Sequence, residues 1–290
     1  MRSARAPAIG ALLVAGLSAC GTASPTGPLA PIPTARIAVV VLENHGPAAV
    51  LRHGWLARAA RHGGRAVDAV GEPHPAQPYF VMLSGALRPL SDRQAISHPV
   101  AQANLTTQLD RRRVSWIAYM DSMPYPCYGR TSASAGTGLY VKRHNPFEFF
   151  ADVVGNAADC RSDVVPGRRL AAAIATRRLP RLAWITPNVC EDMHSCPVSA
   201  GERWMARALP PLIAALGPHG LVLVVADERS PAGRGGGRIP LVALGPEARP
   251  GSVLRRRVDH RALLATIEDL LGLGRLPGTR TSPTLRALLR

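Results

Sequence analysis

The stretch RIAVVVLENH, residues 36–45, decides the fold that we expect for this chain. Residues 36–42 form an apolar, β-branched run, and Glu43 and Asn44 follow it directly. A continuous apolar run suits a strand that is buried on both faces, as in a parallel sheet covered by helices. The polar pair then lies at the carboxyl end of the strand, where open α/β sheets bind their ligands. The stretch therefore predicts a buried strand that leads into a site.

Similar apolar runs recur along the chain, and helical patterns alternate with them. The runs are SWIAYM (115–120), RLAWIT (181–186), LVLVVA (221–226) and IPLVALG (239–245), and the helical segments lie at about 48–61, 101–111, 166–177, 201–216 and 260–272. This alternation is typical of an α/β fold with a mostly parallel central sheet and helices on both faces. The chain has 290 residues, of which 47% are hydrophobic and 19% charged, which suffices for one sizeable core. We expect a single domain.

Polar residues follow three of the predicted strands. Besides Glu43 and Asn44, residues 188–194 follow the run at 181–186, and Asp227 and Glu228 follow the run at 221–226. One carboxylate in such a place is commonly a helix cap, but three groups at one edge of a sheet would point into one crevice. The oxygen donors that suit a hard divalent cation are those of Glu43, Asn44, Asp227 and Glu228. Asp192 and His194 would add ligands or a proton donor.

The first residues, MRSARAPAIGALLVAGLSACG (1–21), read as an export signal. Two arginines precede an apolar run that is too short to span a bilayer, and the run stops at small residues around Cys20. The end of the run resembles a bacterial lipoprotein signal over residues 1–19, in which Cys20 is lipidated; the alternative is an ordinary cleaved signal peptide. Residues 20–34 then form a Pro-rich tether. We expect an exported protein that is anchored to the outer face of the cell membrane, or secreted if it is not lipidated.

The charge of the chain indicates an anionic partner. Without Arg2 and Arg5 of the signal, 33 of the 35 basic residues remain against 19 acidic ones, a net charge near +14. No nucleic-acid motif is present, and 4% aromatic residues provide no evident stacking platform, so nucleic acid is excluded as the partner. Anionic lipid headgroups or phosphate esters fit an exported protein better.

Four cysteines remain after Cys20, and an even set in an oxidising compartment predicts two disulfides. The four are Cys127, Cys160, Cys190 and Cys196. Three pairings are possible. The short separation of Cys190 and Cys196 favours a local bridge and leaves Cys127 with Cys160. A zinc site is the weaker alternative, because the spacings are not those of a CxxC pair.

Several motifs, taken in order, resemble the phosphoesterase family that groups bacterial acid phosphatases and phosphatidylinositol-3-phosphatases with phospholipase C-type enzymes. This family belongs to the alkaline-phosphatase-like superfamily. The motifs are VVVLENH (39–45), NLTTQL (104–109) with SWIAYM (115–120), YVKRHNPFEFF (140–150), ITPNVCEDMHSC (185–196), VVADE (224–228), GGGRIPLVALGP (235–246) and HRALLATIEDLLGL (260–273). The resemblance covers about residues 36–275, so we assign a phosphoesterase domain to 35–275 and a C-terminal tail to 276–290.

The resemblance implies a metal-assisted phosphomonoesterase, in which Glu43, Asn44, Asp227 and Glu228 bind a divalent metal of unknown identity. A serine or threonine takes the phosphoryl group in that scheme, and a histidine such as His194 or His144 protonates the leaving alkoxide. Asp192 joins His194 and His144 in the catalytic set. Three residues are assigned to substrate binding: His74, Asn188 and Arg238. Arg238 belongs to the glycine-rich run GRGGGRIP (233–240), which is either a flexible loop or a phosphate cradle.

The loop at residues 74–79 departs from that family. Similar members typically read His-Pro-Ser-x-Pro-Asn-Tyr there, with the serine as nucleophile, whereas this chain has His74-Pro75-Ala76-Gln77-Pro78-Tyr79. Alanine cannot form a phosphoenzyme. Three replacements are conceivable: Ser84, which would lie roughly 12 Å further along a helix, attack by Tyr79 or His74, and direct attack by water activated by the metal.

Two functions of different classes therefore remain. The first is an exported hydrolase of phosphate monoesters, acting on phosphoinositide-like or other small phosphate esters. The second is a catalytically inactive relative that binds a metal or a phosphorylated ligand in the cell envelope. Ala76 favours the second function and the retained carboxylates favour the first. A purely structural envelope lipoprotein ranks last, since it needs no crevice lined by carboxylates.

Overall fold

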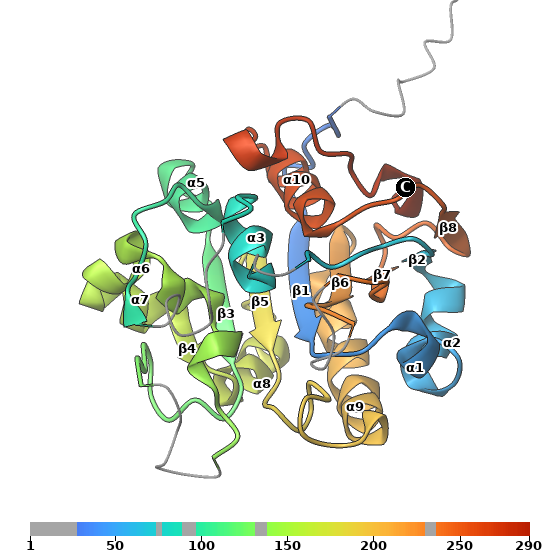
Figure 1. Ribbon diagram of the computed structural model, residues 1–290, viewed down its shortest axis with the longest axis horizontal. Coiled ribbons are helices and arrows are strands. Elements are labelled where there is room, and N and C mark those ends of the chain that lie inside the picture. Colours follow the sequence, from blue (N-terminus) through green and yellow to red (C-terminus); the bar gives the residue numbers. More distant parts are fainter. Residues whose placement is uncertain (1–27, 74–76, 89–96, 131–137, 230–235) are drawn as a thin grey trace, which may run out of the picture.

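The protein, described here from a computed structural model, is built on one sheet with helices packed against it (Figure 1). The structure describes residues 28–73, 77–88, 97–130, 138–229 and 236–290. Within these ranges eight strands follow the order β4-β3-β5-β1-β6-β7-β2-β8. Their bounds are β1 Arg36–Leu42, β2 Gly64–Ala66, β3 Trp116–Met120, β4 Val164–Pro166, β5 Leu182–Thr186, β6 Gly220–Ala226, β7 Leu241–Leu244 and β8 Ser252–Leu254.

Most neighbouring strands of the sheet are parallel. Strands β4, β3, β5, β1 and β6 run in one direction, β7 is antiparallel to both β6 and β2, and β2 is parallel to β8. In β1, Val39 pairs with Trp184 on one side and with Leu223 on the other. Residues 37–42 have no solvent exposure, as the apolar run predicts for a strand covered on both faces. The predicted α/β fold with a mostly parallel sheet is confirmed.

Helices cover both faces of the sheet in two groups. Helix α3 packs against α5 and α10, whereas α9 packs against α2 and α8, and Figure 1 shows the two groups on opposite sides. The helices are α1 Pro47–Val50, α2 Gly54–His62, α3 Pro78–Ser84, α5 Leu105–Arg111, α6 Ala151–Gly155, α7 Ala157–Asp163, α8 Arg168–Ala175, α9 Val198–Leu216 and α10 His260–Leu271, with 3₁₀ turns η1 Lys142–His144, η2 Pro146–Phe149, η3 Pro277–Thr279 and η4 Arg286–Leu288. The helix expected at about 48–61 is thus two helices.

The helix that follows the 74–76 loop has clear end signals. Gln77 caps α3 by accepting the backbone N–H of Phe80, and Pro78 occupies the first turn, where its missing N–H costs nothing. Gly85 ends the helix in the left-handed conformation, with φ of 66°, which favours glycine. The helix is buried along its length, so it belongs to the core of the domain.

Two disulfides are present, and they join the expected pairs. Cys127 bonds to Cys160, which fixes the loop after β3 to α7, and Cys190 bonds to Cys196 within the loop after β5. The two bridges use all four cysteines, so none of them is free to bind zinc. The second bridge closes the segment that carries Asp192 and His194.

The residues at 276–290, set apart above as a C-terminal tail, pack onto the domain. Leu285 and Leu288 have no exposed surface, and the buried carboxylate of Glu268 accepts hydrogen bonds from the backbone of Leu276 and the hydroxyl of Thr279. At the other end, the backbone N–H of Leu29 donates to Asp269, near the end of α10. In the part of the chain that the structure describes, helices of sufficient length and apolarity to cross a membrane are absent.

Candidate functional site

The carboxyl ends of the three central strands bring three acidic side chains together. Glu43 follows β1, Asp227 follows β6, and Asp192 lies in the loop after β5; their exposed fractions are 2%, 6% and 0%. The backbone N–H of Glu43 donates to the carbonyl of Asp192 at 2.8 Å. That of Asn44 donates to Asp227 Oδ1 at 2.9 Å. The chain entering the loop after β1 is therefore tied to both neighbouring strand ends.

Asn44 occupies the left-handed region with φ of 59°, which asparagine tolerates better than most residues. This turn allows two contacts at once. The backbone N–H reaches Asp227, and the side-chain Nδ2 donates to Glu43 Oε2 at 3.1 Å. The predicted set Glu43, Asn44 and Asp227 is thus one hydrogen-bonded unit, and Glu228 follows it half-buried.

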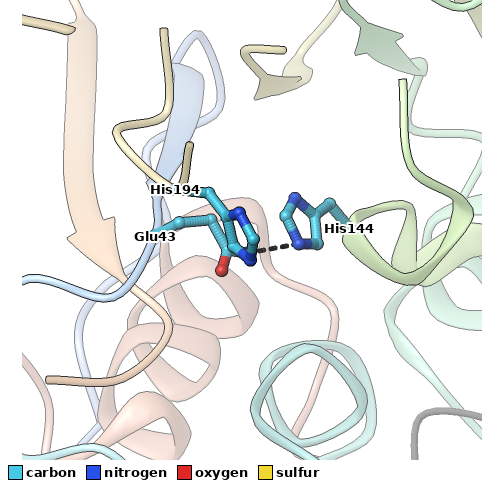
Figure 2. A group of neighbouring side chains, drawn as sticks. All are labelled: Glu43, His144 and His194. Atoms are coloured by element: carbon cyan, nitrogen blue, oxygen red, sulfur yellow. Dashed lines mark ion pairs between the residues drawn. The ribbon is translucent and has the colours of Figure 1, made fainter. Parts of the chain in front are cut away.

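A histidine lies between two of these carboxylates. His144, in η1, places Nε2 3.4 Å from Glu43 Oε1 (Figure 2). Its Nδ1 lies 3.1 Å from Asp192 Oδ2. Its ring stacks on Tyr79, with centroids 5.9 Å apart and planes inclined by 15°. The Tyr79 hydroxyl in turn donates to Glu43 Oε1. The ring of His144 is therefore fixed on three sides.

His194 lies beside this group but has a different partner. Its Nε2 accepts a hydrogen bond from Arg143 Nη2 at 2.9 Å, and its Nδ1 lies 2.9 Å from the hydroxyl of Ser195. The backbone N–H of His194 donates to Asp192 Oδ1 at 2.7 Å. Burial, His144 and Arg143 lower the pKa of His194, which agrees with a neutral ring that accepts from the guanidinium.

All three buried carboxyl groups have raised pKa values. Burial raises the pKa of Glu43 well above its ordinary range, and the charges of Asp227 and Asp192 raise it further. Burial also raises the pKa of Asp227, and it raises that of Asp192 to about 7. Ionising all three buried carboxyl groups would destabilise the folded state unless a cation neutralised their charge.

The donor chemistry suits a divalent cation. Carboxylate oxygens are ligands that hard cations prefer, and the carboxylates of Glu43 and Asp227 are both hydrogen-bonded to Asn44. The potential ligand atoms of Glu43, His144 and His194 also lie within 4.8 Å of one another (Figure 2). The geometry thus combines a place for a metal with two imidazoles and one guanidinium.

A family model described as the Phosphoesterase family matches residues 18–274. The chain belongs to this family. Phosphatidylinositol-3-phosphatase of Mycobacterium tuberculosis is 27% identical over 265 residues, which cover 88% of this chain and 83% of that protein. A probable acid phosphatase of Kluyveromyces lactis is 30% identical over 218 residues, which cover 71% of this chain and 51% of that protein. The chain thus spans about half the length of the yeast relative.

Solved structures support the fold of this phosphoesterase-family chain. A protein in the alkaline phosphatase superfamily from Vibrio parahaemolyticus matches with a TM-score of 0.55 and 12% identity, over 88% of this chain and 72% of that one. Murine ectonucleotide pyrophosphatase/phosphodiesterase 5, an inactive form in complex with AMP, matches with a TM-score of 0.56 and 10% identity, over 88% of this chain and 100% of that one. The predicted resemblance is confirmed, and family and relatives together support a hydrolase that acts on phosphoric ester bonds.

The residues predicted to bind substrate in this phosphoesterase-family chain have other partners in the structure. Asn188 uses Oδ1 to accept the backbone N–H groups of Cys190 and Glu191, and its Nδ2 donates to Asp121 and Glu191. It therefore organises the loop that carries Asp192. Arg238, shortly before β7, is exposed, and its Nε lies 3.1 Å from Asp68 Oδ1. His74 and Ala76 lie outside the described residues, as does Cys20.

Two side chains considered as replacements for the missing serine are engaged elsewhere. Ser84 is buried, and its hydroxyl donates to the carbonyl of Phe80, one helical turn earlier. Tyr79 is buried and donates to Glu43, and both burial and the nearby carboxylates raise its pKa well above the ordinary value. A phenol that is held protonated is a weak nucleophile.

Three features of the site were not identified from the sequence. Arg143 donates to His194, and the Tyr79 hydroxyl donates to Glu43. Glu72 forms a buried ion pair with His260, whose other ring nitrogen lies 2.9 Å from the carbonyl of Ala226, just before Asp227. The sequence signal for Arg143 is its place directly before His144, in the run KRH (142–144).

Proposed function

We propose that this protein is an exported, metal-assisted hydrolase of phosphate monoesters in which water attacks phosphorus directly, without a phosphoenzyme at residue 76. The observation that supports it is the buried convergence of Glu43, Asp192 and Asp227 around His144. A chain that had lost all use for the site would gain stability by losing this cluster, because buried like charges oppose folding.

The residues that would hold the metal are Glu43, Asn44, Asp227 and Glu228. When bound, a divalent cation neutralises charge on phosphoryl oxygens and makes a water molecule more acidic. Direct attack needs no side-chain nucleophile, so it is compatible with alanine at position 76. It also agrees with the hydrogen bonds that engage Ser84 and Tyr79.

His144 is the residue that we assign to protonate the leaving alkoxide. Asp192 accepts from Nδ1, which orients the ring, while Nε2 faces Glu43. His194 does not fit this role, because its Nε2 already accepts from Arg143. The guanidinium keeps further N–H groups that suit a phosphoryl group, so Arg143 would orient the substrate.

The proposal places the enzyme outside the cell, with Cys20 lipidated and residues 20–34 as a tether. The N-terminal sequence supports this location. A phosphatidylinositol-3-phosphatase among the relatives supports a phosphate ester of a lipid or another small alcohol as substrate.

The test is hydrolysis of an aryl phosphate by the full chain, with and without divalent metals, beside Asp227→Ala and Ala76→Ser. We expect metal-dependent activity that falls by at least about 100-fold in Asp227→Ala, because even indirect metal partners carry 10- to 100-fold effects. Acid quenching with ³²P-labelled substrate should trap no labelled protein in the wild type. Labelled wild-type protein would disprove direct attack by water.

A second function, a binding protein without catalysis, is favoured by Ala76 alone. In that case the wild type would hydrolyse nothing with any metal, Ala76→Ser would gain activity, and inorganic phosphate would still bind to the wild type. That combination of results would replace the first proposal.

A further inference from the structure

Two exposed arginine triplets lie at opposite edges of the sheet. Arg255–Arg257 follow β8. Arg111 is the last residue of α5, and Arg112 and Arg113 follow it before β3. Since β8 is parallel to β2, and β2 and β6 are both antiparallel to β7, β8 ends at the same edge as β1 and β6. The first triplet therefore shares an edge with the candidate site, four strands or about 19 Å from β1. The second lies at the amino edge.

The acidic residues near Arg255–Arg257 are already paired with other arginines. The segment runs beside residues 67–69, since Val67 donates its backbone N–H to Leu254 and Val258 donates to Asp68. Asp68 pairs with Arg238, and Asp259 pairs with Arg261. The side chains of the triplet make no ion pair or hydrogen bond with other described residues. Three positive charges are therefore left without a counter-charge from the described parts of the protein.

Arg111–Arg113 have the opposite surroundings. They adjoin a cleft of about 780 Å³ whose lining includes Arg113 and four aspartates. The aspartates are Asp110, Asp152, Asp159 and Asp163. Because Arg113 and the aspartates line the same cleft, the negative charges offset the positive potential of the arginines. Salt screens such charges only beyond a Debye length of about 8 Å. Two triplets of equal formal charge thus present different potentials to an anionic partner.

We propose that Arg255, Arg256 and Arg257, with Val67, form a surface that binds an anionic lipid bilayer. Val67 lies next to the triplet and is 38% exposed, one of few large apolar side chains so exposed in the described ranges. A cationic surface with an apolar side chain suits the headgroup region of a membrane. A single-stranded nucleic acid would require aromatic stacking partners, and the segments 66–70 and 254–258 contain none.

This surface would hold the protein with the carboxyl edge of the sheet toward the bilayer. Phosphate groups at the membrane surface would then meet the side of the molecule that carries Glu43 and Asp227. The inference does not depend on the proposed function, because binding to vesicles can be measured without any hydrolysis.

The experiment compares two triple variants of the full chain, R255S/R256S/R257S and R111S/R112S/R113S. Co-sedimentation is measured with vesicles of phosphatidylcholine alone and of phosphatidylcholine with phosphatidylglycerol. The ratio of the two partition coefficients removes any contribution of the apolar N-terminal run, which is common to all samples. Melting temperatures equal to that of the wild type show that both variants are folded.

We expect the ratio to fall by about 100-fold in R255S/R256S/R257S, since each basic residue near an anionic surface contributes about 1 kcal/mol. The ratio should change little in R111S/R112S/R113S, and added salt should weaken wild-type binding. Equal losses in the two variants, or no preference of the wild type for anionic vesicles, would overturn the proposal. So would tighter binding to DNA than to anionic vesicles with the same dependence on residues 255–257.

Discussion

The molecule has two clusters of acidic side chains, at opposite edges of the same sheet, and they differ in what surrounds the carboxylates. At the carboxyl edge, Glu43, Asp192 and Asp227 are buried and lie around one histidine. At the amino edge, four aspartates line a cleft, and three of them are exposed.

The carboxylates of the cleft each have a local donor. Asp110 accepts from Trp116 Nε1, Asp152 from Asn104 and Thr107, Asp159 from Asn156, and Asp163 from Ser162. These contacts tie α5, α6 and α7 to their neighbours. In the buried cluster burial and the charges of Asp227 and Asp192 raise the pKa of Glu43, and in the cleft partial burial and the charges of Asp152 and Asp159 raise that of Asp110 in the same way. The candidate site therefore differs from the acidic cleft in that its carboxylates are buried together, and not in how many carboxylates it has.

The largest expected effect is the loss of activity when a carboxylate of the buried cluster is neutralised. We expect Glu43→Gln to lower kcat/KM for an aryl phosphate by at least about 100-fold, because Glu43 is one of the metal ligands that we propose. Glutamine keeps the shape and can still accept from Tyr79. The matched change in the cleft, Asp110→Asn, keeps the hydrogen bond from Trp116 and should leave kcat/KM within about twofold. Equal losses from the two changes would show that the two clusters do not differ in function.

The next effect concerns metal binding, measured by thermal unfolding. A divalent cation at 100 times its dissociation constant should stabilise the wild type by about 2.7 kcal/mol, which for a chain of this size is a shift of several degrees. Asp110→Asn should show the same shift, and Glu43→Gln should show little of it. A shift that disappears in Asp110→Asn instead would place the cation in the cleft.

Without metal, the same two variants should differ in the opposite sense in stability. Removing one of several buried like charges relieves repulsion and desolvation, so Glu43→Gln should melt a few degrees above the wild type when a chelator is present. Asp110→Asn changes a more exposed side chain and should shift the melting temperature by less. A melting temperature of Glu43→Gln below that of the wild type would show that the cluster supports the fold.

The sequence was sufficient to predict the strands that carry the buried cluster. Residues 36–42 and 221–226 are long apolar runs with acidic residues directly after them, and parallel topology then brings those residues together. Strands β2, β4 and β8 were not predicted, because three residues show no periodicity and the neighbouring strands decide their pairing. The short spacing of Cys190 and Cys196 was enough to predict both disulfides.

The partners of the site residues could not be predicted in the same way. Tyr79 and Glu43 are 36 residues apart, and Arg143 and His194 are 51 apart, so their contacts arise only from the packing of α3 and η1 over the strand ends. Asn188 and Arg238 were assigned to substrate because polar residues near strand ends suggest binding. In the structure the loop hydrogen bonds of Asn188 and the ion pair of Arg238 with Asp68 take up these groups.

The smallest effect comes from a carboxylate that is intermediate between the two clusters. Glu191 is half-exposed, whereas three of the four cleft aspartates are exposed, and burial and the neighbouring Asp121 raise its pKa to about 7. Because this pKa lies above the ordinary value of 4.5, the folded state binds more protons than the unfolded state between these values, and stability falls as pH rises from about 4.5 to 7.

The test compares melting temperatures at pH 5 and pH 7 in the presence of a chelator. The decrease in melting temperature between the two pH values should be smaller in Glu191→Gln than in the wild type, by a few degrees at most. The control Asp159→Asn, in the exposed cleft, should keep the wild-type slope. If Glu191→Gln also keeps that slope, then partial exposure is enough to screen a pair of carboxylates, and complete burial is what sets Glu43, Asp192 and Asp227 apart.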